Sequence, residues 1–176
     1  MKNKVKLIVN PFIRIAGGQA LIWGFLGLIV STLLCWISGY HYHGLLHFGP
    51  APNPAWWCYL AEHLIVWLIP ALLFYLGGLF LSHSRIRVID VLGTVLFAQL
   101  PLLGMNLISL LPAMRMMSQM NMNMSPEEML AQPYFILAMI LTLLGLPFLI
   151  LTLIWMFNAL KVSCNCLLYT SPSPRD

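Results

Sequence analysis

The chain has 176 residues, of which 60% are hydrophobic and only 8% are charged, with a mean hydropathy of +0.86. In soluble domains roughly a quarter of the residues are charged, so this composition excludes an ordinary soluble protein. The formal net charge of +4 comes from scattered lysines and arginines that form no basic stripe, which excludes a nucleic-acid partner. We therefore expect an all-α fold, a polytopic bundle of transmembrane helices.

The N-terminal segment is basic and then turns apolar. Lysines stand at positions 2, 4 and 6, and Asn10 followed by Pro11 is a typical helix start. We expect a short helix on the membrane surface, with Phe12 and Ile13 directed towards the lipid.

Four apolar runs are each long enough to cross a bilayer core. In the first, Gly24, Gly27 and Ser31 belong to a seam of small residues at steps of three and four, which predicts close helix packing. Pro70 in the second run and Pro147 in the fourth are expected to bend their helices. The expected spans are residues 19–38, 56–81, 88–111 and 133–157.

The third run concentrates polar residues that a lipid-facing helix would lack. At about 100° per residue, small residues share one side with Asp90, while Gln99 and Asn106 lie on the opposite side. Neither face suits lipid, so this helix is expected to have neighbours on both sides. Asp90 is interpreted as the partner of Arg87 in an ion pair at the headgroup level; a proton or ion relay is the alternative.

Glu62 lies about two turns inside the second run, at the same expected depth as Asn106 on an antiparallel neighbour. The two side chains are expected to form a polar clamp between helices, with Arg115 above them. A coupling-ion site is the sharper alternative, because ionisable residues inside a membrane are costly.

Two segments between spans carry side chains that suit metals. His41, His43 and His47 lie on an expected extended loop, where imidazoles two residues apart suit Zn or Cu(II). The loop after the third span is rich in methionine, whose thioether selects Cu(I). Histidine is also common among interfacial aromatic residues and methionine is a flexible apolar filler, so the sequence predicts no metal and no cofactor. The methionines that would bind copper are Met120, Met122 and Met124.

After this loop, Ser125 and Glu128 have the spacing of a capping box, with Pro126 at the first helical position. A short helix is therefore expected to run to about Gln132.

The distribution of basic residues predicts the orientation. The N-terminus, the turn with Arg85 and Arg87, and Lys161 after the fourth span fall on one side, against a lone Arg115 on the other. Cytoplasmic loops carry the excess of lysine and arginine. We expect a multi-pass protein of the bacterial inner membrane with a cytoplasmic N-terminus.

Residues 166–176 differ abruptly from the chain before them. They match the translation of a widely used transposase sequencing adapter, so we treat them as an artefact. Residues 1–165 are then a single truncated transmembrane domain, and we expect the natural chain to continue into a fifth span.

Three stretches carry a resemblance to a known family: Asn10-Pro-Phe, the segment 87–101, and Asn158-Ala-Leu-Lys-Val-Ser. Over most of residues 10–165 the chain resembles the bacterial branch of the YIP1 (Yip1-domain) membrane proteins. The resemblance implies five helices and a cytoplasmic N-terminus. The Asp-Leu-Tyr-Gly-Pro motif of eukaryotic members stands here at best as Asp90-Val-Leu-Gly-Thr. Eukaryotic members are linked to Rab GTPases and vesicle traffic, which bacteria lack, so we carry over fold and topology but not Rab binding.

The sequence shows no Ser-His-Asp pattern, glycine-rich phosphate loop or helix-borne metal pair, so we expect no enzyme activity. The favoured function is a non-enzymatic membrane scaffold or interaction protein, with the lipid bilayer, other membrane proteins or further copies of the chain as partners. The alternative is a small permease or ion-coupled carrier that uses Glu62 and Asn106, which the mid-helix prolines support. A Cu(I)-binding protein that uses the methionine-rich loop is a third reading.

Overall fold

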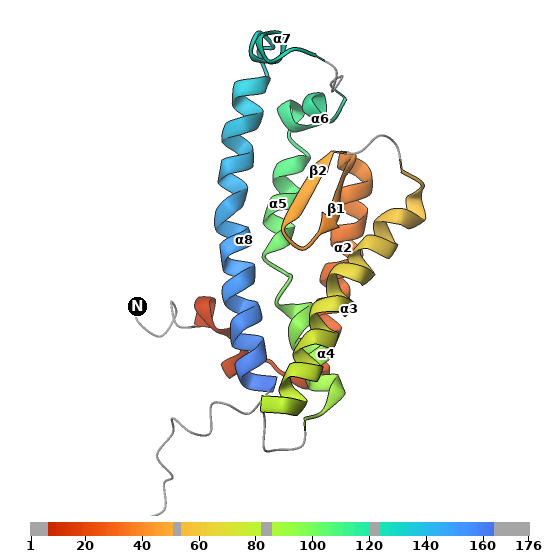
Figure 1. The fold of residues 1–176 in the computed structure, drawn as a ribbon, viewed down its shortest axis with the longest axis vertical. Coiled ribbons are helices and arrows are strands. Elements are labelled where there is room, and N and C mark those ends of the chain that lie inside the picture. The colour runs from red at the N-terminus through yellow and green to blue at the C-terminus, as the bar shows by residue number, and fades with distance from the viewer. Residues whose placement is uncertain (1–6, 51–53, 82–85, 120–123, 164–176) are drawn as a thin grey trace, which may run out of the picture. The chain divides into compact units, whose positions relative to one another are not determined.

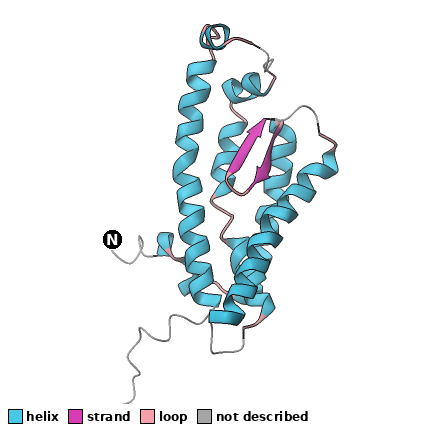
Figure 2. Ribbon diagram, in the orientation of Figure 1, coloured by secondary structure: helices cyan, strands magenta, loops and turns pink. Residues whose placement is uncertain are grey.

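The structure is a computed structural model that describes residues 7–50, 54–81, 86–119 and 124–163. Most of these residues are helical, and a single hairpin of two strands lies among the helices (Figures 1 and 2). The elements are η1 Pro11–Ile13, α2 Gly17–Ser38, β1 Tyr40–Gly44, β2 His47–Pro50, α3 Trp56–Leu81, α4 Val88–Phe97, α5 Leu102–Ser109, α6 Pro112–Ser118, α7 Pro126–Leu130 and α8 Phe135–Ser163.

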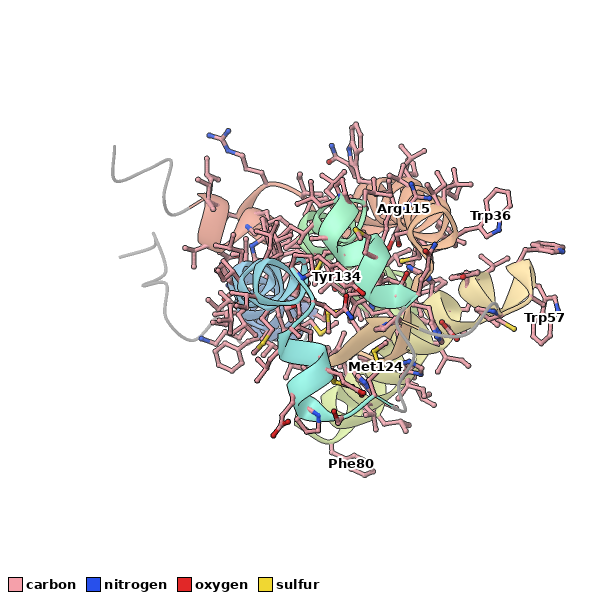
Figure 3. The ribbon with its side chains drawn as sticks, turned by 90° about the horizontal axis from the view of Figure 1, so that it is seen from above. Trp36, Trp57, Phe80, Arg115, Met124 and Tyr134 are labelled. Atoms are coloured by element: carbon pink, nitrogen blue, oxygen red, sulfur yellow. The ribbon has the colours of Figure 1, made fainter. Side chains whose placement is uncertain are left out.

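Within the described ranges, four helical segments are long and apolar enough to span a membrane, which confirms the expected bundle. Trp36 near the end of α2 and Trp57 near the start of α3 point away from the helices (Figure 3), as aromatic residues do at a water–lipid boundary. The fourth segment extends past the expected end, and Lys161 in its last turn lies 4.3 Å from the centre of the Phe157 ring. The segments are Gly17–Ser38, Trp56–Phe80, Val88–Ser109 and Phe135–Ser163.

The central span is two helices rather than the one continuous helix that the sequence predicted. After Phe97, the N–H groups of Gln99 and Leu100 bond to carbonyls three residues back, which tightens the end of α4. Pro101 has no N–H to continue the ladder, and α5 begins after it. The sequence predicted that this third span is surrounded by other parts of the protein. Half of its most apolar stretch is buried, against 17% for α8, which agrees with that prediction.

The described chain forms two compact units. Unit 1 contains residues 1–27, 67–100 and 151–176, and an aromatic cluster lies within it. The ring of Phe97 stacks on Trp155 at 5.5 Å, and Phe12 meets both rings edge-on. The Trp155 indole also donates to the Ile8 carbonyl at 2.7 Å. Phe12 is therefore buried while Ile13 is exposed, so the two do not face lipid together as expected.

Glycines allow close backbone approach in unit 1. A Cβ on Gly93 of α4 would lie 2.5 Å from the Gly17 carbonyl oxygen, and one on Gly24 of α2 would lie 2.7 Å from Leu96. The small-residue seam thus lets α2 and α4 touch.

Unit 2 contains residues 28–66 and 101–150, and the hairpin lies within it. Tyr42 pairs with Phe48 in the antiparallel register, and the register shifts before Gly44. The sequence predicted an extended loop here, not strands. Tyr40 and Tyr42 are buried, and the Tyr40 hydroxyl donates to the Met114 carbonyl of α6 at 3.0 Å. Burial raises the pKa of Tyr40 to about 12.

The methionine-rich segment is only partly a loop. Residues Pro112–Ser118 form helix α6, which the sequence did not predict, and Met114 on it is buried. The capping box is confirmed: Ser125 Oγ accepts from the Glu128 N–H, and the Glu128 carboxylate accepts from the Ser125 N–H at 2.8 Å. These hydrogen bonds to the charged form lower the pKa of Glu128.

Candidate functional site

Four buried polar side chains of unit 2 form one continuous chain of hydrogen bonds. The Tyr42 hydroxyl of β1 lies 2.7 Å from Asn106 Oδ1 of α5, and Asn106 Nδ2 contacts Ser31 Oγ of α2. Ser31 Oγ lies 2.6 Å from His63 Nε2 of α3, and His63 Nδ1 lies 2.7 Å from the Tyr59 carbonyl. The chain therefore joins three helices to the hairpin.

The chemistry of the two ends fixes the direction of every bond. The Tyr59 carbonyl can only accept, so His63 carries its proton on Nδ1. In the neutral imidazole Nε2 then accepts the Ser31 hydroxyl proton. Ser31 Oγ accepts from the Asn106 amide, whose oxygen accepts from Tyr42. Tyr42, Asn106, Ser31 and His63 each donate to an acceptor in this arrangement, and such pairing lowers the cost of burying polar groups.

Because the four side chains are buried, their hydrogen bonds matter for the stability of the fold. Asn106 is 0% exposed and Tyr42 is 2% exposed, and Ser31 and His63 are also buried. Burial raises the pKa of Tyr42 well above its ordinary value, so its hydroxyl stays protonated and able to donate. A buried polar group without a partner costs about 1–3 kcal/mol. The arrangement is therefore suited to holding the hairpin against the helices.

A second polar group joins the hairpin to α3. His41 Nδ1 lies 2.7 and 2.8 Å from the two carboxylate oxygens of Glu62. The structure thus pairs Glu62 with His41, whereas the sequence predicted a clamp between Glu62 and Asn106. His41 Nε2 is buried and has no hydrogen-bond partner.

The imidazole rings of the three hairpin histidines lie next to one another in tilted pairs. The ring centres of His41 and His43 are 4.2 Å apart, and those of His43 and His47 are 4.7 Å apart. Desolvation, and then the neighbouring His41 and His47, lower the pKa of His43 and favour its neutral form. In the part of the chain that the structure describes, no three His, Cys, Asp or Glu side chains are arranged to hold a metal ion.

The remaining predicted site residues lie in other segments of the chain. Asp90 Oδ1 sits beside Gly17, and its backbone N–H bonds to the Arg87 carbonyl. Among the described salt bridges there is no Arg87–Asp90 pair, which corrects that expectation. An acidic residue in the first turn of α4 is instead favourable for the helix dipole. Gln99 is half-buried in the turn after α4. Of the three methionines that the sequence suggested as copper ligands, Met120 and Met122 lie outside the described residues and Met124 lies within them.

Sequence reasoning missed Ser31, Tyr42 and His63 as partners. Ser31 was expected in a packing seam, and Tyr42 lies in the segment that was expected to be an extended loop. A serine and a histidine each buried in a span are a signal, because hydrocarbon offers them no partner. The third component, Tyr42, is brought in by the hairpin, which the sequence did not predict.

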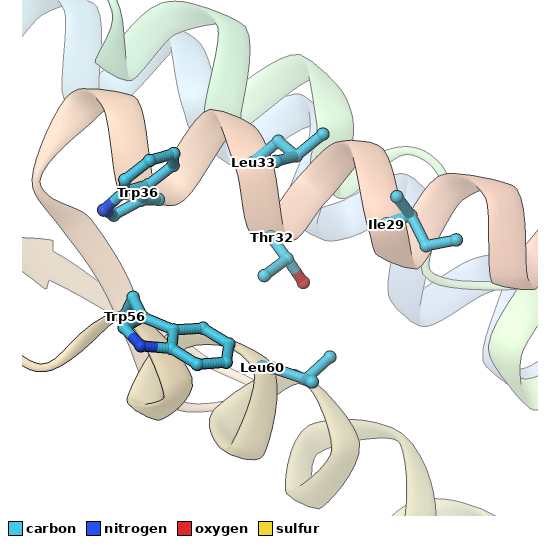
Figure 4. Close-up of a pocket in the computed structure, with 6 residues that line it drawn as sticks. All are labelled: Ile29, Thr32, Leu33, Trp36, Trp56 and Leu60. Atoms are coloured by element: carbon cyan, nitrogen blue, oxygen red, sulfur yellow. The ribbon is translucent and has the colours of Figure 1, made fainter.

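An apolar cavity of about 290 Å³ lies beside the network, between α2 and α3 of unit 2. Trp36 and Trp56 flank one end of it (Figure 4). Its one polar side chain, Thr32, donates its hydroxyl to the Leu28 carbonyl of its own helix at 2.9 Å. The cavity thus presents hydrocarbon to an occupant, and none of the four network residues lines it.

Comparisons of the chain with family models, with curated proteins and with solved structures found no match.

Proposed function

We propose that the chain is a non-enzymatic integral membrane protein with a scaffold or interaction role in a bacterial inner membrane. The observation that carries this proposal is the closed hydrogen-bond chain from Tyr42 to the Tyr59 carbonyl. Because these polar groups bind one another, they hold the hairpin in place and are not free to bind a substrate. The resemblance of residues 10–165 to the YIP1 family supports the membrane fold and its topology, not a particular role.

The proposed orientation places the N-terminus in the cytoplasm and α6 outside. It rests on the basic N-terminus and Lys161 against the single Arg115. In a variant without native cysteines, a membrane-impermeant thiol reagent added to spheroplasts should label Ser118→Cys and not Lys161→Cys. Labelling of Lys161→Cys alone would show the inverted orientation.

The interaction role predicts protein contacts at the exposed faces of the spans. Leu73 on α3 is 61% exposed, whereas Ala71 on the same helix is 1% exposed. A photo-crosslinking amino acid at position 73 should give a discrete protein adduct in cells, and the same group at position 71 should give none. An adduct of twice the chain mass would identify a second copy as the partner. Adducts with lipid alone at position 73, and at other exposed span positions, would contradict the interaction role.

An ion-coupled carrier is the second candidate, and the His41–Glu62 pair favours it. An ionisable pair with an unpartnered imidazole nitrogen is able to take up and release a proton. Such a carrier should acidify proteoliposomes in response to a pH gradient, and Glu62→Gln should abolish this flux. Thr32→Val is the control, since its hydroxyl bonds only within its own helix. Equal, background flux in wild type and Glu62→Gln would exclude the carrier.

A further inference from the structure

A second cavity in unit 2, of about 250 Å³, is lined by three methionines and a histidine. Met105 comes from α5, Met114 and Met117 come from α6, and the exposed His47 comes from β2. Residues far apart in sequence thus supply thioether and imidazole side chains to one space.

The geometry of α6 explains why two of the methionines share this cavity. Met114 and Met117 are three residues apart, so they lie on one face of the helix, and Met116 is 48% exposed on another. The Tyr40 hydroxyl holds the Met114 carbonyl at 3.0 Å, which fixes this turn against the hairpin. Met114 itself is buried.

The chemistry of the lining selects for a soft, singly charged cation. Thioether sulfur and imidazole nitrogen are neutral donors that suit Cu(I), and among the described residues that line this cavity none is acidic or a cysteine. Hard divalent cations prefer carboxylate oxygens and find none here. The Thr142 hydroxyl lies 4.0 Å from Met114 Sδ, and one such contact leaves a sulfur lone pair for a metal.

We propose that Met105, Met114, Met117 and His47 form a Cu(I) site. The site takes His47 from the predicted histidine set and Met114 and Met117 from the methionine-rich segment, but it contains none of Met120, Met122 and Met124. It goes beyond the scaffold role and does not depend on it.

The test uses the full chain purified in detergent, with Cu(I) supplied anaerobically as its acetonitrile complex in competition with a chromogenic chelator. We expect one Cu(I) per chain. Removing residues that merely support a metal ligand lowers affinity by about 10–100-fold, so Met114→Leu/Met117→Leu, which removes two ligands, should lower it by more than about 100-fold. Met116→Leu is the matched control and should bind as the wild type does.

Leucine nearly conserves the volume of methionine, so the double variant should keep its helical circular dichroism and its elution volume. If it does not fold, Met105→Leu and His47→Gln test the same site singly, and each should weaken binding. Wild-type protein that retains no Cu(I) would overturn the proposal. So would a folded Met114→Leu/Met117→Leu variant that binds Cu(I) as tightly as the wild type.

Discussion

Replacing Asn106 with leucine is expected to lower the free energy of unfolding by about 1–3 kcal/mol, because two buried hydrogen bonds are lost. The Tyr42 hydroxyl loses its acceptor, and Ser31 Oγ loses a donor. Hydrogen bonds between membrane helices contribute about 0.6 kcal/mol on average and about 1.7 kcal/mol at most. A loss in the upper half of the expected range therefore requires that both hydrogen bonds of Asn106 contribute. Titrating mixed micelles with SDS while following circular dichroism measures the effect.

The matched control is Thr32→Val, one residue from Ser31 on α2. The Thr32 hydroxyl bonds only to the Leu28 carbonyl of its own helix, so its removal should change stability by less than about 0.5 kcal/mol. A double-mutant cycle with Tyr42→Phe should give a coupling of about 0.6–1.7 kcal/mol with Asn106→Leu. Losses that simply add would show that the Tyr42–Asn106 bond does not contribute.

Replacing Gly93 with alanine is expected to destabilise unit 1 by about 1–3 kcal/mol, because the new methyl group has no room. It would lie 2.5 Å from the Gly17 carbonyl oxygen and 3.0 Å from the Leu21 nitrogen, and backbone atoms cannot rotate away as a side chain can. Helix α4 would have to move off α2.

Gly77→Ala on α3, in the same unit, is expected to have the opposite effect on stability. Among the described residues, no atom outside the neighbouring helix backbone lies within 4 Å of a Cβ at Gly77, so alanine should stabilise the helix by up to about 1 kcal/mol through its higher helix propensity. The same SDS titration should separate the two variants by about 1–4 kcal/mol. A Gly93→Ala protein as stable as Gly77→Ala would mean that α2 and α4 do not touch at Gly93.

The spans were predictable because twenty apolar residues in sequence carry the signal by themselves. The capping box was predictable for a similar reason, since Ser125 and Glu128 bond only to each other's local backbone. The hairpin was not. Its turn contains no Asn-Gly or Asp-Gly signal, and its strands are held by contacts with distant helices, such as Tyr42 with Asn106.

The sequence identified individual residues of the candidate site but not which residues bind one another. Glu62 and Asn106 were recognised as buried polar residues, but periodicity gives a depth and a face, not a partner. Once the hairpin lies between the helices, its histidine and tyrosine take up the two groups that the sequence paired with each other. Gln99 was expected on the face of Asn106, and the break before Pro101 removes the continuous helix on which that expectation depended.

The long separations within the hydrogen-bond chain also bear on how the protein is made. Asn106 follows Ser31 by 75 residues and Tyr42 by 64. At about 5–20 residues per second, the ribosome reaches Asn106 roughly 4–15 s after Ser31. His63 is synthesised earlier, so Ser31 and His63 can pair first, while the Tyr42 hydroxyl has no amide to bind until the third span is synthesised. In a chain arrested before α5, His41 of the hairpin can already pair with Glu62 of α3, but the Tyr42 hydroxyl still lacks its amide acceptor.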